Sequence, residues 1–259
     1  YSIDVSFQSC TFFNCGISPN EAIINITNKD STIKLSDCNF SFKNGTAASS
    51  VFCFLGLNAE IEACNFDRCG TIYFNCQYSN GTFSFINNTA TNLCQQFLNV
   101  SDMSSITEIS GNVFKNVLIK KQSFIYIVHH DDEIDLKNNT FENITSKDSL
   151  VCGGGISMII LNSEFLLTQF IFDHCYFIDN VNNRTSDSKF SFGGAFHFGY
   201  SAFTSNSSVQ FVNCEFRGNN CTDGKGGALV INIYDDIILS DCIFERNKAK
   251  EEGGAIYII

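Results

Sequence analysis

Short runs of alternating apolar and polar residues recur along the whole chain, separated by polar turns. Residues 240–259 show the pattern most clearly, with a Cys-x-Phe-x-x-Asn box, a polar turn, a glycine pair and a second alternating run. Alternation with a period of two is typical of a β-strand with one buried face, and no helical period appears. The pattern therefore predicts an all-β protein.

The box recurs nine times, and its phenylalanine marks each unit of roughly 29 residues. The markers are Phe12, Phe40, Phe66, Phe83 or Phe85, Phe114, Phe141, Phe177, Phe216 and Phe244. Only the fourth unit is ambiguous. In the other units the residue five positions before the marker is apolar, and these residues are Phe7, Leu35, Ile61, Ile109, Leu136, Phe172, Phe211 and Leu239. This constant offset predicts a strand that enters each box through a fixed two-residue bend.

A second alternating run follows each box, and in the last four units it follows a glycine cluster. We expect its inward residues to be Ile156, Met158, Phe196, Phe198, Leu229, Ile231, Ile256 and Ile258. We expect its outward residues to be Ser157, His197, Val230 and Tyr257. Apolar runs at 24–26, 51–54, 72–74 and 124–127 fill the same place in earlier units.

Units of this size, with two or three short strands each, cannot bury an apolar face alone. Stacked coils bury it, with Phe over Phe and Asn over Asn, and pair each strand with its equivalent in the next coil. The sequence thus predicts a single parallel β-helix over residues 1–259, with about nine coils and right-handed winding. An antiparallel sandwich would need a hairpin turn in every unit, and the candidates Asn44-Gly45 and Asn80-Gly81 do not recur.

The two ends of the sequence and its charge bear on its partners. The chain starts at Tyr1 and ends in half a strand at 255–259, so we expect a segment of a longer protein or a protomer that abuts another copy. The net charge is −11 and no basic cluster occurs, which argues against nucleic acid as a partner. No apolar run is long enough to insert this segment into a membrane.

Eleven Asn-x-Ser/Thr sequons occur, although 29 Asn and 43 Ser plus Thr would give about five by chance. The sequons lie at Asn25, Asn39, Asn44, Asn80, Asn87, Asn99, Asn138, Asn143, Asn183, Asn206 and Asn220. The excess favours a secreted, N-glycosylated protein with covalent glycans. The alternative is that turns rich in Asn and Ser generate sequons without glycosylation. Asn39 lies on a predicted strand between two inward residues, so its side chain should point outward.

Thirteen cysteines favour an oxidising compartment, and the odd number leaves at least one unpaired or in an intermolecular bond. Six stand two residues before a marker and should line the interior, either as buried thiols or as disulfides between coils: Cys10, Cys38, Cys64, Cys175, Cys214 and Cys242. The better disulfide candidates are Cys15, Cys53, Cys69, Cys76, Cys94, Cys152 and Cys221. No Cys-x-x-Cys pair suggests a zinc site, and we expect no metal or cofactor.

Candidate catalytic groups are sparse. The acid-rich stretch His129-His130-Asp131-Asp132-Glu133 is the one cluster that could act in a β-helix polysaccharide lyase or hydrolase, and its other interpretation is a solvated turn. Asp37, Asp173 and Asp241 recur near the box, where two of them belong to the bend, and His197 is expected on an exposed strand position. The run 245–252 is expected to be a charged turn. We assign no catalytic residue.

The pairing of Gly-Gly-Ala-(Ile/Leu/Phe) with Phe-x-x-Asn resembles the repeat of the chlamydial polymorphic outer-membrane proteins and of related protist proteins. The resemblance is complete from about residue 141 and implies a secreted or cell-surface right-handed β-helix used in adhesion. We expect no autotransporter barrel within residues 1–259, and the sequon excess fits a eukaryotic surface better. We therefore expect a non-enzymatic structural or adhesive β-helix, either an adhesin repeat domain that contacts cell-surface ligands or an extracellular fibre subunit. A carbohydrate-active enzyme is the alternative.

Overall fold

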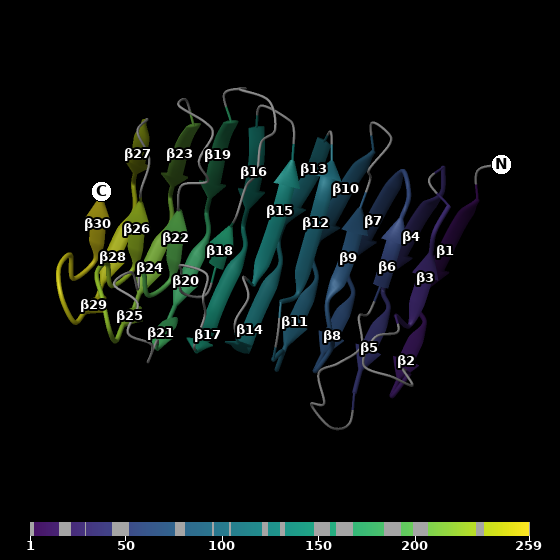
Figure 1. The fold of residues 1–259 in the computed structure, drawn as a ribbon, viewed down its shortest axis with the longest axis horizontal. Helices are drawn as coiled ribbons and strands as arrows, with labels where there is room; N and C mark the ends of the chain where they lie inside the picture. Colours follow the sequence, from purple (N-terminus) through teal and green to yellow (C-terminus); the bar gives the residue numbers. More distant parts are fainter. Residues whose placement is uncertain are drawn as a thin grey trace.

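The chain folds into a parallel β-solenoid, as predicted. A computed structural model describes residues 3–15, 22–28, 30–42, 52–75, 81–94, 96–103, 105–120, 124–129, 133–147, 156–158, 168–183, 193–198, 207–231 and 236–258. All regular elements in these ranges are strands, and every pair of neighbouring strands is parallel. The strands stack along the long axis from β1 at one end to β30 at the other (Figure 1). The handedness stays a prediction.

Each coil contributes strands to the three faces of the solenoid, with three strands in coils 1 to 6 and four in coils 7 to 9. Sheet A contains β1 (Asp4–Gln8), β4 (Thr32–Ser36), β7 (Asn58–Glu62), β10 (Thr82–Ile86), β13 (Ser105–Ser110), β16 (Glu133–Lys137), β19 (Thr168–Asp173), β23 (Ser207–Val212) and β27 (Ile237–Ser240). These nine strands correspond to the nine predicted units, and coils are numbered 1 to 9 in their order.

Sheet B follows sheet A across the predicted bend. Its main path contains β2 (Thr11–Phe13), β5 (Asn39–Ser41), β8 (Asn65–Asp67), β11 (Thr89–Thr91), β14 (Val113–Lys120), β17 (Thr140–Lys147), β20 (Tyr176–Ile178), β24 (Glu215–Arg217) and β28 (Ile243–Glu245). Three short strands extend it beside β17, namely β21 (Val181–Asn183), β25 (Asn220–Cys221) and β29 (Lys248–Ala249).

Two sheets form the third face. Sheet C contains β3 (Ile24–Ile26), β6 (Phe52–Leu55), β9 (Ile72–Asn75), β12 (Leu98–Met103) and β15 (Ile125–His129). Sheet D contains β18 (Ile156–Met158), β22 (Phe196–Phe198), β26 (Leu229–Ile231) and β30 (Ile256–Ile258). Sheet D thus coincides with the units that carry glycine clusters in the sequence.

The bend between sheets A and B has the same backbone conformation in all nine coils. One residue per coil has φ between 51° and 66°, in the left-handed region. These residues are Ser9, Asp37, Ala63, Asn87, Gly111, Asn138, His174, Asn213 and Asp241. Short polar residues and glycine tolerate this conformation best, which explains why Asn and Asp recur there. The assignment of Asp37 and Asp241 to the bend is confirmed.

The core is a continuous stack of aromatic and aliphatic side chains. The markers of adjacent coils pair in register, and the rings of Phe177 and Phe216 are parallel with centroids 4.6 Å apart. Apolar residues five positions before the markers also pair directly, as Leu136 does with Phe172. Inward cysteines are confirmed, since Cys38, Cys64, Cys175 and Cys214 are buried and Cys10 and Cys242 pack against the same core.

The marker of the fourth unit was predicted wrongly. Phe83 and Phe85 both lie on β10 in sheet A, and Ala90 occupies the marker position between Phe66 and Phe114. The small Ala90 side chain leaves space that the ring of Phe85 fills, because this ring stacks on both Phe66 and Phe114 with centroids 6.1 and 6.3 Å apart. In this coil the ring that fills the core comes from the neighbouring strand β10. Identification of the marker by phenylalanine alone therefore assigns the wrong residue to the marker position.

Buried asparagines form two separate columns. At the bend between sheets A and B, Asn112 Nδ2 donates to Asn139 Oδ1 at 3.0 Å, and the backbone N–H of Asn88 donates to Asn112 Oδ1 at 2.9 Å. At the far end of sheet B, Asn180, Asn219 and Asn247 repeat this arrangement. The predicted stacking of Asn over Asn is therefore confirmed for the last three boxes.

One other predicted orientation was wrong. Val230 is fully buried, although alternation predicted it outward, because the backbone of Gly226 folds over it. A Cβ on Gly226 would lie 2.4 Å from Val230 Cγ2. Ile258, predicted inward, pairs in register with the buried Ile231, and it is 56% exposed because β30 is the outermost strand of sheet D.

Candidate functional site

The predicted catalytic cluster is mostly outside the described residues. His129 ends β15 and Glu133 begins β16, whereas 130–132 lie outside, as do the side chains of both flanking residues. The side chain of His197 on β22 also lies outside. The described part of the chain contains no group of three His, Cys, Asp or Glu residues placed to hold a metal ion. No helix within it has the length and apolar character to cross a membrane.

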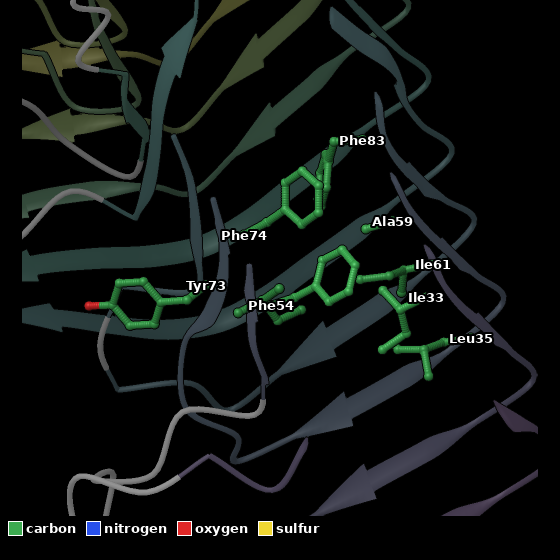
Figure 2. Close-up of a pocket in the computed structure, with 9 residues that line it drawn as sticks. Ile33, Leu35, Phe54, Ala59, Ile61, Tyr73, Phe74 and Phe83 are labelled. Carbon is green, nitrogen blue, oxygen red and sulfur yellow. The ribbon is translucent and has the colours of Figure 1, made fainter. Parts of the chain in front are cut away.

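A small cavity lies inside the solenoid between sheets A and C. Its volume is about 10 Å³, no more than a single water molecule needs, and its lining includes Phe54, Phe74 and Phe83. In Figure 2 these rings point toward one another and toward Ile33, Leu35 and Ile61, whereas Tyr73 points away on the other side of its strand. An apolar space of this size is a packing defect and has no room for a ligand.

The sequons occupy positions of different exposure. Asn25, Asn39, Asn87, Asn138 and Asn143 are exposed, and Asn39 points outward from β5 as predicted. Asn99, Asn183 and Asn220 are half-buried, and Asn44, Asn80 and Asn206 lie outside the described residues. Asn87, Asn138 and Asn143 have left-handed backbone conformations, which asparagine adopts more readily than most residues. The turn geometry by itself thus accounts for three sequons, and glycosylation stays a prediction.

The cysteines form no disulfide among the described residues. Of the seven candidates, Cys76 and Cys152 lie outside these residues, and Cys69 is buried with its thiol donating to the carbonyl of Phe40 at 3.1 Å. Cys15 and Cys53 are half-buried thiols at a bend and on β6. Cys94 is half-buried and Cys221 is buried on β25. Their pairing stays a prediction.

The outer surfaces of sheets A and B are charged, and their charges pair between coils. Lys34 contacts Glu60 on sheet A at 2.5 Å, and Lys115 contacts Glu142 on sheet B at 2.7 Å. Burial raises the pKa of Asp67 on sheet B, but hydrogen bonds from Asn92 and Arg68 outweigh it and hold this pKa below its ordinary value. Exposed pairs of this kind contribute little stability each.

A cluster on coils 8 and 9 joins the loop before β26 to β30. Lys225 Nζ donates to Glu252 at 2.8 Å and to the Tyr257 hydroxyl at 2.9 Å, and lies 4.4 Å from the centre of the Tyr257 ring. The hydrogen bond to Glu252, followed by that to Tyr257, raises the pKa of Lys225. Lys250 pairs with Asp223 beside it, so the predicted charged turn at 245–252 connects neighbouring coils.

The outer face of sheet C differs from the other two because its described side chains are all uncharged. Asn25, Cys53, Tyr73 and Asn99 form one row in direct register across four coils. Leu55 and Asn75 form the adjacent row. Tyr73 is 39% exposed and Leu55 40% exposed. We call these six residues the sheet C face. Amide groups beside an exposed aromatic ring can bind an uncharged polar ligand by hydrogen bonds and by stacking.

The importance of Tyr73 was missed in the sequence, although a signal for it was present. The run Ile72-Tyr73-Phe74 was identified as a third-face strand, and Ile72 and Phe74 are both buried, as alternation requires. Alternation thus placed Tyr73 outward. What the sequence could not provide was the register that sets Tyr73 beside Asn99 and Cys53.

Comparisons with known proteins agree with the repeat pattern. Residues 241–259, which contain the last box and its glycine pair, match the Chlamydia polymorphic membrane protein repeat. Over 203 residues, or 78% of the chain, it is 29% identical to the protein described as probable autotransporter YfaL of Escherichia coli K12. The chain spans 14% of the length of that protein. The expected resemblance is thus confirmed. No solved structure matches the chain.

Proposed function

We propose that this chain is a surface-displayed β-helix with an adhesive role, which binds an uncharged ligand through the sheet C face. Its similarity to an autotransporter and to a membrane-protein repeat supports a location at the cell surface or outer membrane. The single observation that supports a binding role is the uncharged row on sheet C, which carries Tyr73 between Cys53 and the amide of Asn99, whereas sheets A and B carry charged pairs on their outer surfaces.

The fold suits display more than catalysis. In-register columns of Asn and Phe fix each coil on the next, so side chains on the outer faces lie on rigid strands about 4.8 Å apart. Repeated spacing of this kind fits an extended ligand such as a neutral oligosaccharide, which presents similar groups at regular intervals. The enzyme alternative depends on residues 129–133, of which 130–132 lie outside the described residues.

Two versions of the structural role differ in their partners. An adhesin repeat domain would continue into further coils of a longer protein and contact a cell-surface ligand. A fibre subunit would contact other copies of itself. We favour the adhesin repeat because the matched autotransporter is a much longer protein, of which this chain covers 14%. Electron microscopy of the native protein distinguishes the two, since filaments with a regular axial repeat would favour the fibre.

We expect Tyr73→Ala to reduce binding to neutral oligosaccharides by at least tenfold. Tyr73 is the largest exposed side chain of the sheet C face, and removal of its ring takes away the stacking surface while its buried neighbours stay in place. The measurement is binding of the purified chain to an array of neutral oligosaccharides, with thermal unfolding of each variant recorded alongside.

The matched control is Tyr176→Ala on sheet B. Tyr176 is 37% exposed, close to the 39% of Tyr73, and it also lies in the middle of a stacked row. Binding should be unchanged in this variant. An equal loss in both variants, or none in Tyr73→Ala, would refute the assignment to sheet C. Failure of the wild-type chain to bind cells or oligosaccharides at all would refute the adhesive role itself.

A further inference from the structure

At the bend between sheets A and B, cysteine and asparagine perform the same hydrogen-bonding task. Asn88, Asn112 and Asn139 donate from Nδ2 to the carbonyls of Ile61, Phe85 and Ile109 in the preceding coil at 2.8 to 2.9 Å. Cys38, Cys175, Cys214 and Cys242 occupy the same position in other coils, and Sγ lies within hydrogen-bond distance of the carbonyls of Phe7, Leu136, Phe172 and Phe211 at 3.2 to 3.5 Å. All seven acceptors belong to one register column of sheet A. Each of these thiols also lies 3.3 to 3.6 Å from the carbonyl two residues before it. Cys64, at the same position in coil 3, donates to the carbonyl of Glu62 in its own coil at 3.2 Å.

At the far end of sheet B, asparagine and cysteine again occupy one donor position in different coils. Asn180, Asn219 and Asn247 donate to the carbonyls of the markers Phe141, Phe177 and Phe216 at 2.8 to 3.0 Å. Cys69 takes this position in coil 3 and donates to the marker Phe40 at 3.1 Å. Thus each of the two bends has one buried position at which cysteine or asparagine donates in these coils. At the far end of sheet B, the buried apolar residues Leu93, Val117 and Ile144 stand at the equivalent position in coils 4 to 6.

We infer that cysteine and asparagine are interchangeable at these two positions, and that the bend cysteines act as buried thiol donors and form no disulfides. The inference is independent of the proposed adhesive role. A buried carbonyl without a donor is destabilising, and the two side chains are similar in size, so each supplies the donor without disturbing the core. A disulfide would remove the S–H groups that make these hydrogen bonds.

Strand geometry also disfavours disulfides between stacked cysteines. Glu215, which follows Cys214, pairs in parallel register with Tyr176, which follows Cys175. Side chains stacked in such register point the same way, so their Cβ atoms are separated by about the strand spacing of 4.8 Å, whereas a disulfide needs about 3.8 Å. A hydrogen bond that the Cys214 thiol donates to Cys175, followed by burial, raises the pKa of Cys214 to about 12, and burial raises that of Cys64 to about 12. Such thiols ionise little at neutral pH and react slowly.

Mapping of the thiols in the wild-type protein tests the inference directly. The purified chain would be incubated with glutathione disulfide, alkylated in denaturant without reduction, digested, and analysed by mass spectrometry. We expect Cys38, Cys64, Cys69, Cys175, Cys214 and Cys242 to be recovered as alkylated thiols. Peptides that join Cys175 to Cys214, Cys214 to Cys242 or Cys38 to Cys64 would overturn it.

A pair of variants at one position tests interchangeability. In Cys175→Asn, Nδ2 can donate to Leu136 and Oδ1 can accept from the backbone N–H of Asn139, which extends the first asparagine column by one coil. We expect this variant to unfold at the same or a higher urea concentration than wild type, and Cys175→Ala at a lower one. Equal destabilisation of both variants would show that size, and not the donor, determines the residue at this position.

Discussion

Replacement of Gly227 by alanine is expected to destabilise the protein by about 3 kcal/mol and to loosen coil 9. A Cβ at this position would lie 1.9 Å from the carbonyl oxygen of Gly254 and 2.5 Å from the backbone nitrogen of Lys248. Both contacts are with backbone of the next coil, so no side-chain rotation can relieve them. The two coils would have to separate, with loss of the hydrogen bond from Gly227 N–H to the Gly253 carbonyl. Urea unfolding of the purified variant measures the loss.

The chain provides an exact positional control in the next repeat. Gly254 is the equivalent glycine of coil 9, and among the described residues no atom other than those of its chain neighbours lies within 4 Å of a Cβ placed on it. Neither glycine has a left-handed backbone, so both substitutions test space alone. In a protein made of residues 1–259 alone, Gly254→Ala should change the free energy of unfolding by less than about 0.5 kcal/mol. A similar loss in both variants would mean that the glycine pair is selected for its conformation and not for close stacking of coils.

The register of the fold could be predicted from the sequence because it depends on residues that repeat at fixed offsets. Leu136, Phe172 and Phe211 lie five positions before their markers and pair in one column, as expected. The fourth coil failed because Ala90 holds the marker position while Phe85 supplies the missing volume from another strand. A large side chain on one strand can fill the space that a small side chain leaves on another strand. Which strands are neighbours in space cannot be seen from the sequence pattern.

Only one of the two asparagine columns could be predicted from the sequence. Asn180, Asn219 and Asn247 belong to this column, and each lies three positions after its marker phenylalanine. Asn112 and Asn139 lie two positions before their markers, where other coils have cysteine, so they escape a rule written for Asn after Phe. The equivalence became visible only when both residue types were seen to bond the same column of carbonyls.

The sheet C face was harder to predict from the sequence than the core. Alternation placed Tyr73 outward, but an outward tyrosine is common on any sheet. Its distinguishing feature is the absence of charge from the described side chains on the strands beside it, which requires knowledge of which strands are neighbours. The charged residues of sheets A and B lie far from these residues in sequence. The difference between the uncharged sheet C face and the two charged faces was therefore not visible in the sequence.

Replacement of Asn112 by alanine is expected to have the largest effect of any single side-chain truncation at the bends, about 3 to 5 kcal/mol. Asn112 is fully buried at the centre of the first column. Its removal leaves the backbone N–H of Asn88 and the carbonyl of Phe85 without the partners they have at 2.9 and 2.8 Å. Each buried group left in this way costs about 1 to 3 kcal/mol. Urea unfolding followed by far-ultraviolet circular dichroism measures the change.

Asn65→Ala is the matched control, because Asn65 is an asparagine on β8 whose side chain points to solvent. It should unfold within about 0.5 kcal/mol of wild type. Asn112→Cys provides an intermediate case, since a thiol restores a donor for the Phe85 carbonyl but no strong acceptor for the Asn88 N–H. The expected order of stability is therefore wild type, then Asn112→Cys, then Asn112→Ala. If the cysteine variant were no more stable than the alanine variant, the donor would not be the property that the two residue types share at this bend.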